Sequence, residues 1–169
     1  MERENLEPES PSPKREFIVR SCAILIHGSA VLAEEAAYGD GTSFYCLPGG
    51  HVKFGEDLAS TLSREIDEEA GLNVEVDKLV YVHENFYRHR GVDSHEIGFY
   101  FLVDLSSEFP APDGEGYIPH RESHLRMRLL PLDDLRRVPL RPAFLAERLP
   151  FDARESFSRP TRHLVTREE

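Results

Sequence analysis

The sequence predicts an α/β protein made of one compact domain, and three observations support this fold class. Short apolar runs typical of strands recur along the chain. One longer segment, residues 57–70, has the periodicity of an amphipathic helix. The length of 169 residues suits a single domain with a sizeable core.

The first part of the chain is expected to form strands joined by turns. The expected elements are a strand from Phe17, a hairpin turn at His27-Gly28-Ser29 between Ala23–Ile26 and Ala30–Ala33, a loop at 34–43, and a short strand at Ser43–Leu47. Pro48-Gly49-Gly50 follows, where two glycines permit a backbone turn that other residues would resist.

The segment 57–70 separates two kinds of side chain on one helix, with Asp57 as the expected N-cap and Gly71 at its end. Glu65, Glu68 and Glu69 fall within about 100° of one another. A separate apolar stripe is available for burial, formed by Leu58, Ala59, Leu62, Ile66 and Ala70. Because like charges at these spacings cost a few tenths of a kcal/mol per pair, a neutralising divalent cation is the simplest explanation of the acidic face.

The second half returns to strands and ends in short helices. The expected elements are an extended segment at Val74–Phe86 with room for a bulge, a polar turn at Tyr87–Ser94, a strand at His95–Leu105, a long loop at 106–124, a strand at Leu125–Leu130, and proline-led helices at Pro131–Val138 and Pro142–Leu149. Long structureless loops in compact domains are often functional, which directs attention to 106–124.

Composition separates the domain from its ends. Residues 1–16 are charged, rich in proline and poor in apolar residues, so we expect a disordered N-terminal tail. The domain is expected to occupy 17–150. Residues 151–169 have mixed charge and are expected to form a loosely docked or disordered C-terminal tail.

Charge and cysteine content limit the possible partners and compartments. A net charge of −11 argues against nonspecific binding to nucleic-acid polymers or membrane surfaces. No apolar run is long enough to span a bilayer, and the polar N-terminus lacks the features of a signal peptide. Cys22 and Cys46 lie in apolar runs and are expected to be reduced and buried. We therefore expect a cytoplasmic protein.

Residues 50–72, GHVKFGEDLASTLSREIDEEAGL, resemble the Nudix box, Gly-x5-Glu-x7-Arg-Glu-U-x-Glu-Glu-x-Gly-U, in which U is a bulky aliphatic residue. Every specified position matches: Gly50, Glu56, Arg64, Glu65, Ile66, Glu68, Glu69, Gly71 and Leu72. The resemblance covers roughly 17–149, although only 47–72 is diagnostic. It implies the Nudix α/β/α sandwich around a mixed β-sheet.

The resemblance also implies an activity. A Nudix enzyme with this box would be a Mg²⁺- or Mn²⁺-dependent pyrophosphohydrolase that cleaves a nucleoside diphosphate linked to another small group by water attack on phosphorus. One alternative is a sanitising nucleoside triphosphatase that releases pyrophosphate. Another is a non-catalytic nucleotide-sensing module, against which the intact box argues. The leaving group and the oligomeric state, with a homodimer as one possibility, stay open.

Within the box, the resemblance assigns metal binding to Glu65, Glu68 and Glu69, with a backbone carbonyl of Gly49 or Gly50 as a further ligand. Glu56 would either support the loop or contact the metal site. Arg64 would orient one of the carboxylates.

The general base is less closely defined. Some family members use a glutamate in the loop before the last strand. Glu122 lies there and is the first candidate, and Glu115 is the second. Glu68 or Glu69 could instead serve as the base, as in other members.

Substrate contacts are expected from two basic segments in an otherwise acidic chain. Tyr87-Arg88-His89-Arg90 could clasp a distal phosphate, since Arg offers bidentate contacts. A solvated hairpin tip is the simpler explanation of this cluster. His51 and Lys53 follow the glycine pair and could face the substrate.

Overall fold

The computed structural model describes residues 14–38, 40–89, 91–121 and 125–167. Within these ranges the strands are β1 (Lys14–His27), β2 (Ala30–Ala37), β3 (Ser43–Cys46), β4 (Gly49–His51), β5 (Val74–His89), β6 (Val92–Leu105), β7 (Tyr117–Ile118), β8 (Arg126–Pro131), β9 (Leu140–Arg141) and β10 (Arg162–Arg167). The helices are α1 (Leu58–Ala70), the 3₁₀ helix η1 (Leu132–Arg137) and α2 (Phe144–Arg154).

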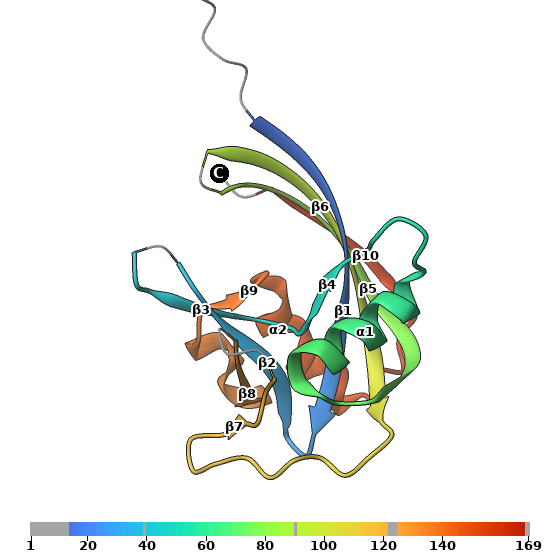
Figure 1. The fold of residues 1–169 in the computed structure, drawn as a ribbon, viewed down its shortest axis with the longest axis vertical. Helices are drawn as coiled ribbons and strands as arrows, with labels where there is room; N and C mark the ends of the chain where they lie inside the picture. Colours follow the sequence, from blue (N-terminus) through green and yellow to red (C-terminus); the bar gives the residue numbers. More distant parts are fainter. Residues whose placement is uncertain (1–13, 39, 90, 122–124, 168–169) are drawn as a thin grey trace, which may run out of the picture.

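The strands form a mixed sheet with β1 at its centre (Figure 1). The order along the main path is β10-β5-β6-β1-β2-β3-β9. β1 runs parallel to β6 over a long register, whereas β5 and β6 form an antiparallel hairpin. β1 and β2 form the expected tight hairpin, in which Ile26 pairs with Val31. Figure 1 shows β2 and β3 diverging from the long β1, β5 and β6 strands.

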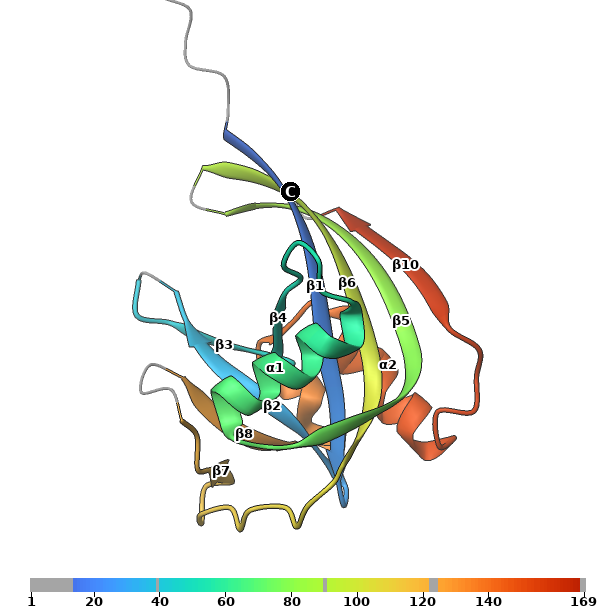
Figure 2. The ribbon, with the colours of Figure 1, turned by 45° about the vertical axis from the view of Figure 1, so that its right-hand side comes forward.

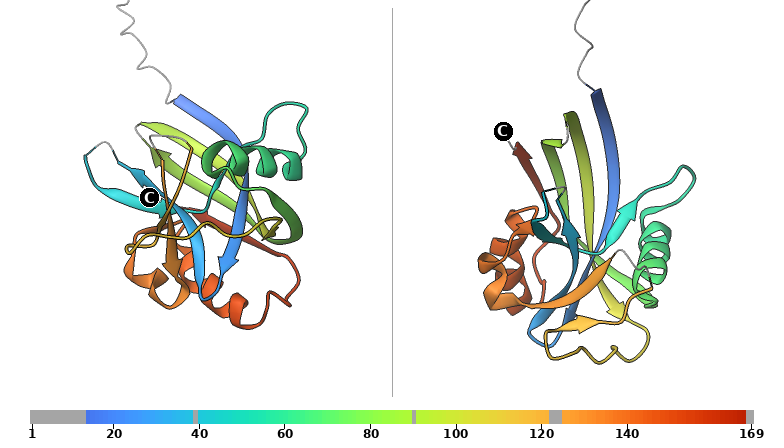
Figure 3. Two further views of the ribbon diagram at one scale, coloured as in Figure 1. Left: turned by 60° about the horizontal axis from the view of Figure 1, so that its bottom comes forward. Right: turned by 60° about the vertical axis from the view of Figure 1, so that its left-hand side comes forward.

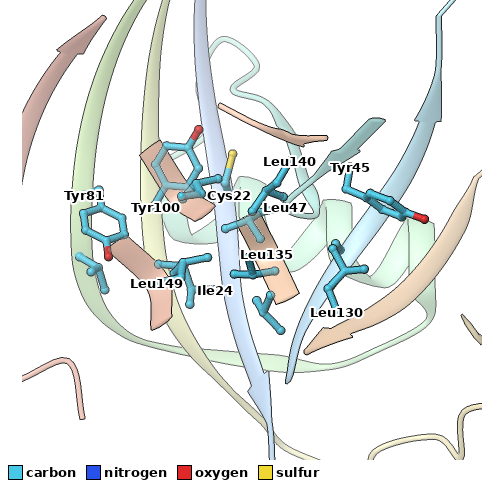
Figure 4. Packing of buried hydrophobic residues seen from close by; sticks show 14 of the residues in the cluster. Cys22, Ile24, Tyr45, Leu47, Tyr81, Tyr100, Leu130, Leu135, Leu140 and Leu149 are labelled. Atoms are coloured by element: carbon cyan, nitrogen blue, oxygen red, sulfur yellow. The ribbon is translucent and has the colours of Figure 1, made fainter. Parts of the chain in front are cut away.

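Alternate side chains of β1 contribute to two separate cores, because successive residues of a strand point to opposite faces. Cys22 and Ile24 belong to the first core cluster, which includes buried residues of η1 and α2 (Figure 4). Ala23 and Leu25 belong to the second core cluster, which includes buried residues of α1. Figure 3 shows the sheet between α1 and α2, so the predicted α/β/α sandwich is confirmed.

α1 begins and ends where the sequence predicts. The Asp57 carboxylate accepts a hydrogen bond from Ser60 N at 2.8 Å. Gly71 ends the helix in the left-handed conformation at φ 68°, and its N–H donates to the carbonyl of Asp67. Thr61, Leu62 and Ile66 are buried against the sheet. The helix is therefore fixed at both ends. Its acidic residues are not all separated from the buried face, because Glu69 is only 8% exposed.

Several expected boundaries were wrong. Residues 34–37 are not loop, because β2 continues to Ala37 by pairing with β3. The predicted turn at Tyr87–Ser94 is mostly strand, since β5 continues to His89 and β6 begins at Val92. The loop at 106–124 contains the short strand β7. The short helix expected at Pro131–Val138 is present as the 3₁₀ helix η1. Long-range pairing extends these strands through residues whose local sequence is polar.

The ends of the chain also differ from expectation. Lys14, Arg15 and Glu16 belong to β1 and pair with β6, so the strand begins before Phe17. The expected tail at 1–16 otherwise lies outside the described residues. No helix in the described ranges is both long and apolar enough to cross a membrane.

The expected C-terminal tail is part of the fold. α2 continues to Arg154, and β10 adds a parallel strand beside β5 (Figure 2). Lys78 Nζ donates to the carbonyls of Phe157 and Arg159 at 2.7 and 2.6 Å, and Leu164 packs on the first core cluster. These long-range contacts, which local composition does not reveal, hold the segment against the sheet.

Asp152 in α2 joins the C-terminal segment to the core. Its side chain is 1% exposed and accepts hydrogen bonds from the Tyr81 hydroxyl and the Arg162 guanidinium. Arg162 also lies 5.5 Å from the centroid of the Tyr81 ring. One buried carboxylate therefore connects β5, α2 and β10.

Asp152→Ala should lower the free energy of unfolding by about 3–5 kcal/mol, because it leaves Arg162 partly buried without its ion-pair partner. Asp133→Ala is the matched control, since Asp133 pairs with Arg154 at 2.8 Å with both side chains well exposed. The control should cost about 0–1 kcal/mol. Urea unfolding of both variants measures the difference, and equal losses would contradict a structural role for the buried carboxylate.

Candidate active site

Arg64 holds three carboxylates of the acidic segment at once. Its Nε and Nη2 donate to the two oxygens of Glu56 at 2.8 and 2.9 Å, forming a bidentate pair. Its Nη1 donates to Glu65 at 2.7 Å and to Glu68 at 3.2 Å. This arrangement offsets part of the repulsion among the glutamates and fixes where their oxygens lie.

Glu56 accepts hydrogen bonds from three residues. Besides Arg64, it accepts hydrogen bonds from the Thr61 hydroxyl at 2.9 Å and from Lys53 N at 3.4 Å. The Arg64 hydrogen bonds lower the pKa of Glu56 from 4.5 to about 2. With both oxygens used in this way, Glu56 is better suited to supporting the loop before α1 than to ligating a metal.

Gly50 makes room for the Glu65 carboxylate. A Cβ at position 50 would lie 2.1 Å from Cδ of Glu65 and 2.4–2.5 Å from its two oxygens. β4 places this glycine beside β1, where Gly50 pairs with Ser21. Glycine is therefore needed at the first position of the box, because a side chain there would occupy the space in which a helix carboxylate approaches the backbone of β4.

Gly49 connects the same turn to the opposite face of the sheet. Its φ of 142° and its close approach to Ser21 O, 2.2 Å from a hypothetical Cβ, require glycine. Its carbonyl accepts a hydrogen bond from Arg20 Nη2 at 2.9 Å. Because this carbonyl already serves a cation, Gly50 is the better candidate for a backbone metal ligand.

A cleft of about 440 Å³ lies on the side of the sheet formed by the first core cluster. Cys22, Leu47 and Tyr100 of that cluster contribute to its lining (Figure 4). The other lining residues are Arg20, Glu34, Ala36, Tyr38, Phe44, Cys46, Asn85, Tyr87, Arg88, His89, Glu96, Arg141 and Pro142. The volume is within the range of small-molecule sites, about 300–1,000 Å³.

The Cys22 thiol of the cleft is buried, and its pKa is shifted upward. Burial raises the pKa of this thiol to about 12, and the negative charges of Glu96, Glu69 and Glu34 contribute to the increase. Glu69 belongs to α1, whereas Glu34 and Glu96 line the cleft.

Both cysteines are free, and Cys46 is only partly buried, so the expectation of two buried reduced cysteines is met fully at Cys22 alone.

The predicted substrate residues fall into separate groups. Tyr87 and Arg88 line the cleft, although Arg88 also lies 3.5 Å from Asp93 across the hairpin. His51 and Lys53 are exposed and are not among the residues that line this cleft. Arg90 lies outside the described residues.

The candidate bases cannot be compared directly, because Glu122 lies outside the described residues. The preceding residue, Arg121, is fixed to the end of α1: its N–H donates to the Glu69 carbonyl at 2.8 Å, and its side chain donates to Asp67 at 2.9 Å. Glu115 is exposed beside β7, and its carbonyl accepts a hydrogen bond from Arg128.

Sequence reasoning missed several polar residues that line the cleft, among them Arg20, Glu34 and Asn85. Arg20 had a detectable signal, since it is a charge inside the strand-like run from Phe17. Glu34 falls in the expected loop at 34–43, and Asn85 falls in the expected extended segment at Val74–Phe86. Their convergence results from pairing between distant segments.

The acidic residues have the donor chemistry that divalent cations prefer. Glu65 and Glu68 approach one nitrogen of Arg64, and the Glu65 carboxylate lies against Gly50. Hard oxygen ligands of this kind suit Mg²⁺. Across the described ranges no three His, Cys, Asp or Glu side chains already form a cluster that could hold a metal. These residues could supply some of the ligands of a cation, but they do not enclose it.

Comparison with known proteins identifies the family. Residues 17–151 match a family profile described as "NUDIX domain". The chain belongs to the Nudix family. It is a Nudix hydrolase, a pyrophosphohydrolase that acts on phosphoanhydrides.

Solved structures share the Nudix fold at low identity. An ADP-ribose pyrophosphatase from Streptococcus suis is 22% identical, with a TM-score of 0.58 over 88% of this chain and 98% of that one. A UDP-X diphosphatase is 16% identical, with a TM-score of 0.61 over 92% and 70%. A MutT NUDIX hydrolase from Burkholderia pseudomallei is 20% identical, with a TM-score of 0.59 over 81% and 97%. At these identities the likeness concerns the fold alone.

Arg64→Gln should raise the pKa of Glu56 from about 2 toward its ordinary 4.5, because it removes the bidentate partner. In the native protein, the stabilisation from ionised Glu56 is fully present above pH 4.5 and is lost as the pH falls toward 2. Carboxyl-carbon NMR titration of both proteins measures the shift. An unchanged Glu56 pKa in the variant would show that Arg64 is not its cause.

Proposed function

We propose that this Nudix hydrolase uses Mg²⁺ or Mn²⁺ to cleave the diphosphate linkage of a nucleoside diphosphate derivative by attack of water on phosphorus. The observation that carries the proposal is the junction at Gly49-Gly50. Gly49 contacts Arg20 of the cleft, and Gly50 contacts Glu65 of the acidic helix. A ligand in the cleft would therefore present its phosphates near carboxylates suited to a cation.

The residues of α1 have distinct proposed roles. Glu65, Glu68 and Glu69, with the Gly50 carbonyl, would hold the cation, while Arg64 keeps the first two carboxylates in place. When bound, a divalent cation neutralises charge on phosphate oxygens and makes the attacking water more acidic. Glu122 is the proposed acceptor of the water proton, because Arg121 next to it in sequence is bound to the end of α1.

The cleft supports a substrate with both charged and neutral parts. Arg20 and Arg88 offer guanidinium groups to phosphates, and Tyr87 adds an aromatic wall. His51 and Lys53 stay proposed substrate contacts on the exposed loop before α1. Two similar structures are named for nucleoside diphosphate derivatives, ADP-ribose and UDP-X, which is consistent with this substrate class. Cytoplasmic location and a possible homodimer stay predictions.

A panel of nucleoside diphosphate sugars, ADP-ribose and nucleoside triphosphates, with products resolved by mass, tests the substrate class. The proposal predicts two monophosphate products from a diphosphate derivative. Release of pyrophosphate from triphosphates, with the diphosphate derivatives left intact, would instead favour a sanitising triphosphatase.

Glu68→Gln and Glu69→Gln should each lower kcat by about 10²-fold or more, because each removes a charge that holds the cation. Activity of the native enzyme should also disappear when chelator is added. Glu147→Gln makes the same chemical change at an exposed position of α2 and should retain normal kcat. Circular dichroism would verify folding. Near-normal turnover in either box variant, or in excess chelator, would contradict the metal assignment.

Glu122→Gln should reduce kcat by about 10- to 10³-fold with little change in KM, because it removes a proton acceptor used mainly in the transition state. Glu115→Gln is the control in the same loop and should behave as wild type. An active Glu122 variant beside an inactive Glu115 variant would reverse the assignment. Full activity in both would place the base within the box.

A further inference from the structure

A chain of hydrogen bonds from the core reaches the cleft at Asn85. The His83 ring is fully buried, and its Nε2 lies 2.8 Å from the Thr166 hydroxyl of β10. That hydroxyl donates to the Asn85 side-chain oxygen at 2.7 Å. Thr166 and Asn85 are directly paired between β10 and β5, which run side by side in Figure 2. Asn85, which lines the cleft, is 8% exposed.

The buried histidine determines the direction of these hydrogen bonds. Burial lowers the pKa of His83 to about 4, so its ring is neutral at physiological pH. In the described part of the chain, Nδ1 of this ring is buried and has no hydrogen-bond partner. A proton on Nδ1 would make this atom a buried donor without an acceptor. Such unpaired donors are rarer and more costly in free energy than unpaired acceptors. His83 Nε2 therefore donates to Thr166, and Thr166 in turn donates to Asn85.

This direction leaves the Asn85 amide nitrogen as a donor. An asparagine side chain has one oxygen acceptor and one NH₂ group with two donors. Thr166 occupies the oxygen, and no hydrogen bond among the described residues uses the nitrogen. Some polar atoms in this part of the chain are fully buried and lack a hydrogen-bond partner, but the Asn85 nitrogen is not one of them. Its N–H groups are consequently available to a ligand in the cleft.

Glu96 provides an acceptor directly beside this donor. Asn85 and Glu96 are paired across β5 and β6, and both line the cleft. Opposed residues in an antiparallel pair have Cβ atoms about 4.5–5.5 Å apart. The Tyr87 hydroxyl donates to one Glu96 oxygen at 3.3 Å. A phosphate at Asn85 would be repelled by Glu96, so a neutral group with a neighbouring acceptor and donor fits better.

We propose that Asn85 is a specificity-determining residue that donates a hydrogen bond to a nucleobase acceptor while Glu96 accepts one from an adjacent N–H of the same base. His83 and Thr166 are positioning residues that fix the orientation of the amide. The Tyr38–Phe44 ring pair, with centroids 4.5 Å apart, adds aromatic surface to the lining of the same cleft. The inference rests on the proposed function, since it assumes that the substrate carries a nucleoside.

Binding of adenosine, guanosine, cytidine and uridine, measured calorimetrically in chelator, tests the inference without metal or turnover. Asn85→Asp keeps the side-chain size but replaces the donor with an acceptor. It should weaken the tightest-bound nucleoside by about 10-fold or more. Where the wild type prefers another nucleoside, Asn85→Asp should also shift the preference toward guanosine, whose N1–H and N2–H₂ groups are adjacent donors.

Thr166→Val should weaken binding by roughly 3- to 10-fold and reduce discrimination among the bases, because the amide loses its orienting partner. Thr161→Val is the matched control: it removes a hydroxyl that donates to the Leu79 carbonyl at 2.7 Å and that is not among the cleft-lining residues. The control should retain wild-type nucleoside binding. Thermal unfolding midpoints would verify that all variants are folded.

Equal nucleoside affinities in the wild type and Asn85→Asp would overturn the inference. So would absence of nucleoside binding to the wild type at millimolar concentration, or binding of methyl ribofuranoside as tight as that of the nucleosides. If diphosphate derivatives are still hydrolysed with Mg²⁺ in any of these cases, the proposed function stands and only the base-reading role fails. If no derivative is hydrolysed, the proposed function fails by itself.

Discussion

Repulsion among clustered carboxylates is the constraint on which the site depends. Glu56, Glu65 and Glu68 all contact one guanidinium, that of Arg64, at 2.7–3.2 Å. A single positive charge cannot offset all of the negative charge of this segment, which also includes Glu69. Arg64 therefore holds the carboxylates in position and leaves an excess of negative charge that a divalent cation can neutralise.

Two consecutive glycines connect this acidic face to the rest of the molecule. Gly50 lets Glu65 approach β4 from the α1 side of the sheet, and Gly49 accepts a hydrogen bond from Arg20 on the cleft side. The backbone between them is paired with β1, the strand shared by both cores. The small-molecule cleft and the carboxylates lie on opposite faces of the sheet, and both contact the turn at Gly49-Gly50.

The box and its helix could be predicted because their determinants are local. Asp57, Gly71 and the apolar stripe set the limits and the buried face of α1 without reference to distant residues. β10 could not be predicted, since Arg162–Arg167 becomes a strand only by pairing with β5. The cleft was missed for the same reason: Arg20, Glu34 and Asn85 come from β1, β2 and β5. A single sequence contains the residues of such a site but not the pairing that brings them together.

Binding of Mn²⁺, measured by electron paramagnetic resonance without substrate, tests the central claim most directly. A Cβ at position 50 would displace only the flexible end of Glu65, so Gly50→Ala should fold normally. The account predicts at least a roughly 10-fold loss of Mn²⁺ affinity in this variant, because one carboxylate ligand moves away. Gly114→Ala, at a glycine with open space around its Cβ position, should bind Mn²⁺ as the wild type does. Equal Mn²⁺ affinity in the wild type and Gly50→Ala would contradict the assignment of the cation to this face of α1.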